Sequence, residues 1–205
     1  MISNKKIKLL EAWKNSIFAE YGIAEIMRIS KKRTKPWVFN ALKQLTKNNL
    51  LLSKRKGNLD IYSLNLNNPF LIQTLQYLDA QNSLDFPHLD VIANAINKIP
   101  IKNYCLLVFG SYAGNKQTKE SDLDICFLIE TKNTEKKIKP YFNEVKLNHK
   151  TDIDEHYIIF NDFVKMLLRG EENLGKQIFR KHILFYNADI YYQLIKEANK
   201  HGFRP

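Results

Sequence analysis

The residues in this sequence that are best suited to chemistry are a Gly-Ser pair and, after ten intervening residues, two acids separated by one residue. The pair, Gly110-Ser111, comes directly after the apolar run 104–109. The acids, Asp122 and Asp124, begin a second apolar run. Both runs are typical of strands that are buried on two faces. Because side chains alternate along a strand, the two carboxylates are predicted to project from the same face.

Two carboxylates on one face of a buried strand suggest a bound cation, because like charges raise each other's pKa unless a cation neutralises them. Mg²⁺ (or Mn²⁺) is the expected cofactor, since both cations accept carboxylates together with substrate phosphate oxygens. The Gly-Ser pair supplies the complementary half. Glycine lets the backbone approach a triphosphate closely, while the serine hydroxyl and nearby N–H groups bind phosphate oxygens. We therefore expect an NTP substrate to be bound by Gly110, Ser111 and the loop residue Lys116, with Lys119 as the alternative loop residue.

A wider stretch around these residues resembles a known family. Phe109-Gly-Ser-Tyr-Ala-Gly114 together with Ser121-Asp-Leu-Asp-Ile125 is similar to the signature of the DNA polymerase beta-like nucleotidyltransferase superfamily, and in particular to its minimal nucleotidyltransferase type. The resemblance is specific over residues 104–130 and weaker beyond them. It implies a mixed β-sheet flanked by helices and a metal-dependent transfer of a nucleoside monophosphate from an NTP to a hydroxyl acceptor. Minimal nucleotidyltransferases resemble antitoxins that nucleotidylate a toxin, so a protein or toxin partner is one expectation.

The resemblance also implies a third carboxylate from a later strand. The one strand-like candidate is the segment 151–159, in which Asp152, Asp154 and His156 alternate onto one face. We take Asp154 as the third acid and Asp152 as the alternative, which makes Asp122, Asp124 and Asp154 the predicted catalytic and metal-binding set. His156 either contacts substrate or is satisfied by its neighbours. If the two later acids are ordinary strand-edge charges, the third carboxylate is missing and turnover is in doubt.

The positive charge of the chain is concentrated in its first third. The formal net charge is +11, and Lys and Arg outnumber Asp and Glu by 14 to 4 in residues 1–68 but only by 18 to 17 in residues 69–205. A basic module without an acid or metal motif of its own favours contact with a phosphate backbone. We therefore expect residues 1–68 to bind nucleic acid.

The apolar pattern of this basic segment predicts three helices and then a β-hairpin. The helices are expected at 5–18, at 23–30 and from about Thr34 to Asn48, and the hairpin strands at 50–55 and 59–64, with Gly57 at positive φ in the turn. This order resembles a winged helix-turn-helix domain, which implies that the third helix enters the major groove and the hairpin follows the phosphate backbone. The contact residues that the resemblance offers are Lys35, Asn40, Lys43, Gln44, Lys47, Lys54, Arg55 and Lys56. The alternative is that the module packs against a partner protein, and a homodimer is a further expectation.

The predicted organisation is therefore α+β with two domains. Residues 1–68 form the winged helix-turn-helix domain, residues 69–86 a linker helix and junction, and residues 87–205 the nucleotidyltransferase domain with its mixed sheet. The helices expected in the last domain lie at about 88–98, 134–146, 163–168, 173–183 and 188–200, and its strands at 104–109, 122–129, 151–159 and 183–186.

Composition excludes several other classes. No apolar run approaches the length of about 20 residues that a membrane span requires, and no signal-peptide core follows the N-terminus. The two cysteines, Cys105 and Cys126, both lie in apolar runs, which favours buried thiols in a reducing cytoplasm over a disulfide or a metal site. A cytoplasmic protein is therefore expected.

Two functions are consistent with these sequence features. The first is an enzyme whose basic module targets DNA, RNA or a partner. The alternative is a DNA-binding transcriptional regulator, or an antitoxin-like protein, whose transferase-like domain binds nucleotide or a partner without turnover. The intact Gly-Ser and Asp-x-Asp elements favour the enzyme, because drift removes paired buried acids readily. A pure interaction scaffold ranks last, since it does not explain why two acids open an apolar strand.

Overall fold

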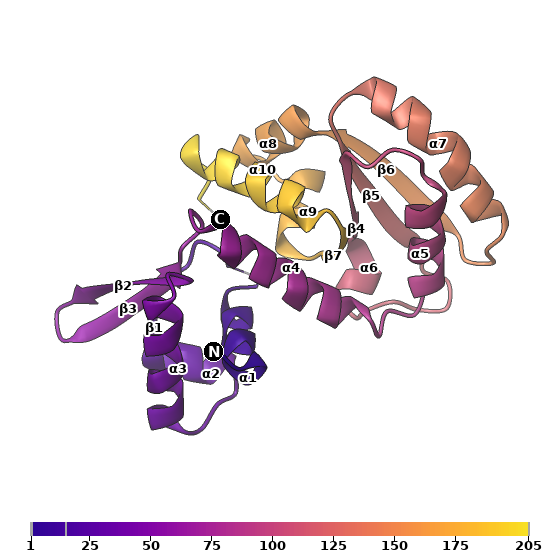
Figure 1. Ribbon diagram of the computed structural model, residues 1–205. Helices are drawn as coiled ribbons and strands as arrows, with labels where there is room; N and C mark the ends of the chain where they lie inside the picture. Colours follow the sequence, from indigo (N-terminus) through magenta and orange to yellow (C-terminus); the bar gives the residue numbers. More distant parts are fainter. Residues whose placement is uncertain (1, 15, 205) are drawn as a thin grey trace. The chain divides into compact units, whose positions relative to one another are not determined.

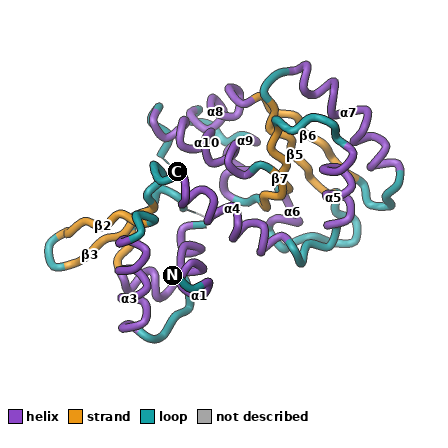
Figure 2. The backbone as a smooth tube through the Cα atoms, in the orientation of Figure 1, coloured by secondary structure: helices purple, strands orange, loops and turns teal. Residues whose placement is uncertain are grey.

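The computed structural model describes residues 2–14 and 16–204 of the chain (Figure 1). Met1, Asn15 and Pro205, which the predicted domain ranges 1–68 and 87–205 include, lie outside the described residues. The chain forms two compact units, one containing the described residues up to Leu78 together with Arg204, and the other Asp79–Phe203. Each unit contains one β-sheet and several helices, so the predicted α+β class is confirmed (Figure 2).

The predicted first helix over residues 5–18 is wrong in type and in length. The chain forms the short α-helix α1 (Asn4–Ile7), which continues as a 3₁₀ helix, η1 (Lys8–Trp13). Residues at i and i+3 eclipse in a 3₁₀ helix, and the buried side chains of η1 have this spacing: Leu9 with Ala12 and Leu10 with Trp13. After Trp13 the chain turns, and the Trp13 indole N–H donates a hydrogen bond to the Ala19 carbonyl at 2.9 Å. The sequence pattern favoured an α-helix because a spacing of three suits both helix types.

The other elements of the first unit follow the predicted order. Helix α2 (Ile23–Ile29) begins where the Gly22 N–H donates to the Glu25 carboxylate at 3.0 Å. Helix α3 (Lys35–Lys47) has Pro36 in its first turn and ends at Asn48, while Thr34 occupies its N-cap position without a side-chain cap bond. Strands β2 (Leu51–Lys56) and β3 (Leu59–Leu64) form the hairpin.

The hairpin belongs to a sheet of three strands, because β1 (Tyr21–Gly22) adds to its edge in the order β1-β3-β2. Its two-residue turn has Gly57 at φ +61 in the first loop position, where a type II′ turn requires glycine. Strand β1 was not predicted, because two residues are too few to show an alternating pattern.

Helix α4 (Pro69–Ser83) continues past the boundary between the units, which lies inside the predicted linker 69–86. In the second unit the last turn of α4 is joined to the final helix, α10 (Ala188–Lys200), by a hydrogen bond from the Tyr192 hydroxyl to the Asp79 carboxylate at 2.6 Å. Helix α5 (Leu89–Lys98) then leads into the sheet.

The sheet of the second unit has the order β6-β5-β4-β7. The central pair β4–β5 and the edge pair β4–β7 are antiparallel, and β5–β6 is parallel, so the sheet is mixed as predicted. The parallel pair requires a crossover, which helix α7 (Lys132–Leu147) provides between β5 and β6. The strands are β4 (Tyr104–Val108), β5 (Leu123–Ile129), β6 (Ile153–Ile159) and β7 (Ile183–Tyr186).

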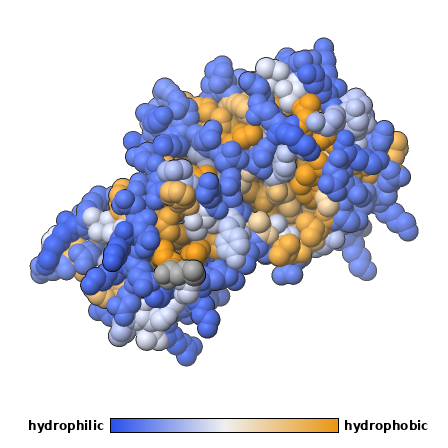
Figure 3. All heavy atoms as spheres, in the orientation of Figure 1, coloured by the Kyte–Doolittle hydropathy of each residue, from blue (hydrophilic) through white to orange (hydrophobic). Residues whose placement is uncertain are grey.

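Helices cover both faces of this sheet (Figure 1). Alternate residues of β4 and β5, among them Leu106 and Phe127, pack with α5 and α7 in one apolar core. The intervening residues, among them Cys105 and Cys126, face the layer of α8 (Phe160–Leu168), α9 (Leu174–Arg180) and α10. Both thiols are buried and free, and burial raises the pKa of each. The outer side of α7 is hydrophilic (Figure 3). No helix in the described part of the chain is long and apolar enough to cross a membrane.

One residue between β7 and α10 gives a test of this fold. Asn187 has a left-handed backbone (φ 47), and its side-chain amide donates to the carbonyls of Lys102 and Tyr104 at 2.6 and 3.0 Å. Substitution of Asn187 by Ala removes both bonds and leaves a residue that tolerates this conformation poorly. We expect the free energy of unfolding of the second unit to fall by about 2 kcal/mol, as measured by urea denaturation. Asn187→Gly, which restores the backbone freedom alone, should recover part of the loss. Two variants as stable as the wild type would contradict this role.

Candidate active site

One strand end, one turn and two strand beginnings meet at one end of the sheet of the second unit. Because β4 and β5 are antiparallel, the end of β4 lies beside the beginning of β5, with Val108 paired to Ile125. Because β5 and β6 are parallel, the beginning of β6 lies at the same end of the sheet, with Asp124 paired to Asp154. The Phe109 N–H closes the arrangement by donating to the Asp124 carbonyl at 3.1 Å.

Gly110 makes the turn from β4 into the short helix α6 (Gly110–Ala113). Its φ is +68, and a Cβ added to it would lie 1.9 Å from the Oδ2 atom of Asp124. Two independent constraints therefore require glycine here: the left-handed backbone and the lack of space beside the Asp124 carboxylate. The next residue, Ser111, directs its backbone N–H to that same carboxylate.

The Asp124 carboxyl is half-buried, and its pKa is raised. The first cause is burial, which disfavours the charged form, and the second is the neighbouring Asp154 carboxylate. The His156 ring and the Ser111 N–H act in the opposite direction. Ionisation of the Asp124 carboxyl therefore costs electrostatic free energy in the folded protein, and a bound cation would offset that cost.

Three side chains meet at this point, and we call them the Asp–Asp–His cluster: Asp124, Asp154 and His156. Each can offer a ligand atom, and these atoms lie within 4.8 Å of one another. The His156 Nε2 and Asp154 Oδ2 atoms are 3.0 Å apart. The Phe109 ring packs edge-on against the imidazole, with ring centroids 5.3 Å apart. The alternation along 151–159 predicted that His156 shares a face with Asp154, and the structure brings the two side chains together. The contact with Phe109 had no signal in the local sequence, because Phe109 belongs to a different part of the chain.

The cluster fits a divalent cation on two observations. Its donors are two carboxylates and an imidazole nitrogen. Carboxylates are ordinary ligands of Mg²⁺ and Mn²⁺, and Zn²⁺ accepts both carboxylate and imidazole. The ligand atoms of the three side chains also lie close enough together, within 4.8 Å of one another, to share one ion. Asp122 is exposed and lies outside the cluster, although its charge contributes to the raised pKa of Asp124.

An open groove adjoins the cluster, with a volume of about 630 Å³. It begins at the acids and extends past the end of α7, and Lys146 in its wall is paired with Glu155. Asp152, the alternative third acid, is exposed in this groove and outside the cluster. The residues that line it are Asp122, Lys146, Leu147, His149, Thr151, Asp152, Ile153 and Asp154.

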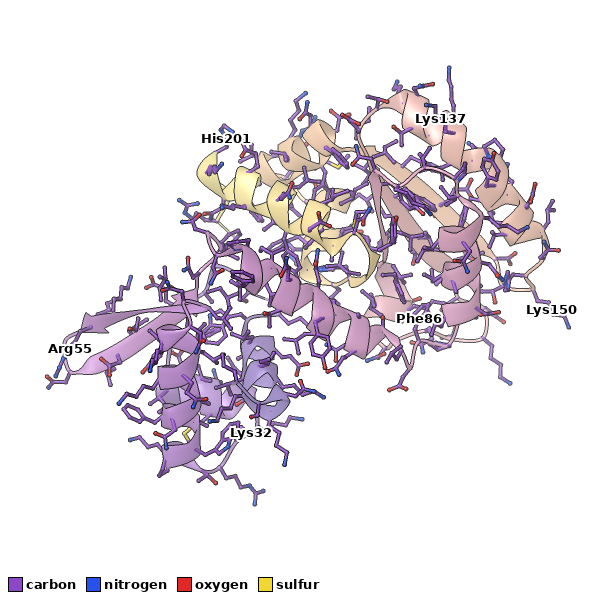
Figure 4. All side chains as sticks on the ribbon, viewed as in Figure 1. Lys32, Arg55, Phe86, Lys137, Lys150 and His201 are labelled. Carbon is purple, nitrogen blue, oxygen red and sulfur yellow. The ribbon has the colours of Figure 1, made fainter. Side chains whose placement is uncertain are left out.

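The remaining predicted site residues lie on exposed segments. Lys116 is exposed in the loop after α6. In the first unit, Lys35, Asn40, Lys43 and Lys47 are exposed on α3, and Gln44 is half-buried and accepts a hydrogen bond from Lys6 at 2.9 Å. Lys54, Arg55 and Lys56 are exposed on β2, where Lys54 forms an ion pair with Glu20. Figure 4 shows Arg55 extending from the end of the hairpin.

Comparison with known proteins bears on the second unit. Residues 94–191 match the family model of the polymerase beta nucleotidyltransferases. The match contains β4 to β7, the Gly110 turn and the whole Asp–Asp–His cluster. It supports a nucleotidyltransferase-type function for this domain, and an NTP substrate with it. No curated protein and no solved structure matches the chain.

The raised pKa of Asp124 predicts how the stability of the second unit responds to pH. Between the ordinary carboxyl pKa and the raised one, the folded state binds more protons than the unfolded state, so stability falls as pH rises through this window. Asp124→Asn removes the charge and keeps an acceptor for the Ser111 N–H. In EDTA at pH 7 we expect this variant to be more stable than the wild type, with the difference disappearing as pH falls below the ordinary carboxyl pKa. Urea denaturation at several pH values measures the stability difference at pH 7 and its disappearance at low pH. The control is Asp162→Asn, which changes an exposed acid on α8. If Asp124→Asn were less stable than the wild type at pH 7, the Asp124 charge would not destabilise the metal-free fold as we infer.

Proposed function

We propose that this protein is a metal-dependent nucleotidyltransferase that moves a nucleoside monophosphate from an NTP to a hydroxyl acceptor. The observation that carries the proposal is the contact between the Gly110 turn and the Asp124 carboxylate, with Asp154 level with it on the parallel strand. This arrangement places a phosphate-accessible backbone turn beside carboxylates that favour a cation. The family match over residues 94–191 supports the same reaction class.

Each residue has a separate task in the proposed reaction. Asp124 and Asp154 hold Mg²⁺ or Mn²⁺, and Asp122 at the groove edge completes the predicted metal-binding set. When bound, the cation supplies positive charge against the phosphate oxygens. The Ser111 hydroxyl, and Lys116 from its loop, contact the triphosphate beside the Gly110 turn. Together these groups align the NTP and neutralise its charge, which are the main protein contributions to phosphoryl chemistry.

The chemical step joins the acceptor to the α-phosphorus. The acceptor oxygen attacks the α-phosphorus and forms a new O–P bond, while the bond from that phosphorus to the oxygen bridging to the β-phosphate breaks. Pyrophosphate leaves with the electron pair of the broken bond. The acceptor proton passes to Asp154, which is exposed at the groove and hydrogen-bonded to His156.

The open groove is the proposed acceptor site. It begins at Asp154, where the acceptor hydroxyl must arrive, and its volume of about 630 Å³ is within the range of small-molecule sites. Its wall combines acids with the apolar side chain of Leu147, which is 86% exposed. The wide opening also admits a side chain or a terminal hydroxyl of a macromolecule.

Turnover gives the direct test of the enzyme. The full chain would be incubated with each NTP labelled on the α-phosphate, with Mg²⁺ or Mn²⁺, and with an RNA oligonucleotide, a DNA duplex or a hydroxyl-containing peptide mixture as acceptor. We expect label transfer with pyrophosphate release, and a loss of about 100-fold or more for Asp124→Asn, because it removes charge stabilisation at the reacting phosphate. Asp162→Asn should retain full activity. Nucleotide binding without transfer to any acceptor would favour the regulator instead.

The first unit is the proposed targeting module. Its α2, α3 and β2–β3 have the order and the positive charge of a winged helix-turn-helix domain, with exposed lysines on α3 and basic residues along β2. We propose that α3 enters the major groove and that Lys54, Arg55 and Lys56 position the hairpin on phosphates. The net charge of +10 in residues 1–68 supports a polyanionic partner.

Salt dependence measures these contacts. For a double variant Arg55→Ala/Lys56→Ala, we expect weaker binding to every duplex and a decrease of about 1 to 2 in the slope of log K against log salt, since each lost phosphate contact changes that slope by about 0.9. Fluorescence anisotropy with a labelled duplex at several salt concentrations gives the slope. The matched control is Lys136→Ala/Lys137→Ala on the exposed side of α7 (Figure 4). Equal effects of the two double variants would mean non-specific charge rather than a hairpin contact.

A further inference from the structure

His156 is the member of the Asp–Asp–His cluster to which the proposed reaction gives no task of its own. It lies two residues after Asp154 on the same face of β6, at the position that pairs with Cys126 of β5. Its side chain is 32% exposed, and the buried ring of Phe109 packs against its imidazole. The ring is thus held beside the two acids by the same β4 end that carries the Gly110 turn.

The distance between the His156 Nε2 atom and the Asp154 Oδ2 atom suits two ligands of one cation. Adjacent ligands of an octahedral ion with bonds of about 2.1 Å are about 3 Å apart. The two atoms are 3.0 Å apart, and the Asp124 carboxylate completes a group within 4.8 Å. The hydrogen bond can therefore be replaced by two metal bonds with the separation of the two atoms unchanged, once the imidazole turns toward the ion.

We propose that His156 Nε2 is itself a ligand of the catalytic cation, and that this imidazole makes the site prefer Mn²⁺ to Mg²⁺. Mg²⁺ favours oxygen ligands and keeps much of its water, whereas Mn²⁺ and later divalent metals accept imidazole nitrogen more readily. The inference rests on the proposed metal site, but it does not require that the site turns over. It assigns to this chain a mixed nitrogen and oxygen site in which the imidazole determines metal preference.

A positioning role for His156 is the competing explanation. In that case its N–H only orients the Asp154 carboxylate, as groups beyond the ligands commonly do, and the cation meets oxygen atoms alone. The two roles predict different spectra of bound Mn²⁺. A nitrogen that ligates Mn²⁺ gives ¹⁴N modulation of the electron spin echo, and a histidine that only orients Asp154 does not give this ligand modulation. They also differ in rescue, because Gln can donate a hydrogen bond to Asp154 but cannot supply an imidazole nitrogen.

The experiment uses the full chain loaded with Mn²⁺ alone, without nucleotide. Electron spin-echo modulation from ¹⁴N is recorded for the wild type, His156→Ala and His156→Gln, and calorimetry gives the Mn²⁺ and Mg²⁺ affinities of each protein. We expect imidazole modulation in the wild type and none in either variant. Mn²⁺ affinity should fall by about 10-fold or more in both variants, while Mg²⁺ affinity changes by less than about threefold. His149→Ala removes the imidazole in the groove wall and should leave the modulation and both affinities unchanged.

The outcomes separate this inference from the proposed function. Mn²⁺ binding without ¹⁴N modulation in the wild type, or full recovery of Mn²⁺ affinity in His156→Gln, overturns the ligand role. Absence of Mn²⁺ binding at this cluster overturns it as well. Clear modulation in a protein that transfers no nucleotide supports the ligand role while the proposed transfer fails.

Discussion

The close contact between the Gly110 backbone and the Asp124 carboxylate is the constraint on which the arrangement of the site depends. A Cβ at position 110 would lie 1.9 Å from the Oδ2 atom of Asp124, so a residue with a side chain would collide with this carboxylate and only glycine fits. The residues on either side of Gly110 also bond to Asp124. The Phe109 N–H is directed to the Asp124 carbonyl, and the Ser111 N–H to its carboxylate. The end of β4 is therefore held against the beginning of β5 by the residues on both sides of the glycine.

The parallel pairing of β6 brings the remaining ligands to this point. Helix α7 returns the chain to the end of the sheet at which β5 began, so β6 runs in the same direction as β5. In this register Asp154 lies level with Asp124, and His156 follows on the same face. An antiparallel β6 would place the end of that strand beside Asp124 instead. The topology therefore assembles a cluster from residues that are 30 positions apart in the sequence, with no long loop needed to deliver them.

The sequence was informative wherever a residue's environment depends on local periodicity. The strands of the second unit and the hairpin around Gly57 are local patterns, and the structure contains both. Of the two acids predicted beside the Gly110 turn, Asp124 contacts it, and Asp122 lies outside the Asp–Asp–His cluster. The α+β class follows from the same patterns. Periodicity could not distinguish an α-helix from the 3₁₀ helix at Lys8–Trp13, because both place residues three apart on one side. It also could not reveal β1, which exists only through its pairing with β3.

Within the site, the sequence pattern gives no reason to distinguish Asp122 from Asp124, but their environments in the structure differ. Asp122 precedes the first residue of β5 and is exposed, whereas Asp124 is half-buried against the Gly110 turn. Alternation gives the direction of a side chain and not its depth, since depth depends on which segment covers it. For the same reason the surroundings of His156 could not be predicted: its neighbours are Phe109 and Asp154, and Phe109, which follows β4, is far from His156 in the sequence.

The electrostatics of the cluster links the stability of the domain to its ligand. Burial and the Asp154 carboxylate raise the pKa of Asp124, so folding without a cation places charge where it is disfavoured. A cation that binds the folded cluster and not the unfolded chain stabilises the fold by mass action. The same unfavourable charge that weakens the metal-free domain therefore strengthens its attraction for a divalent ion. A more stable cluster, with the acids separated or paired to lysines, would lose this attraction, because a neutralised carboxylate has less to gain from a cation.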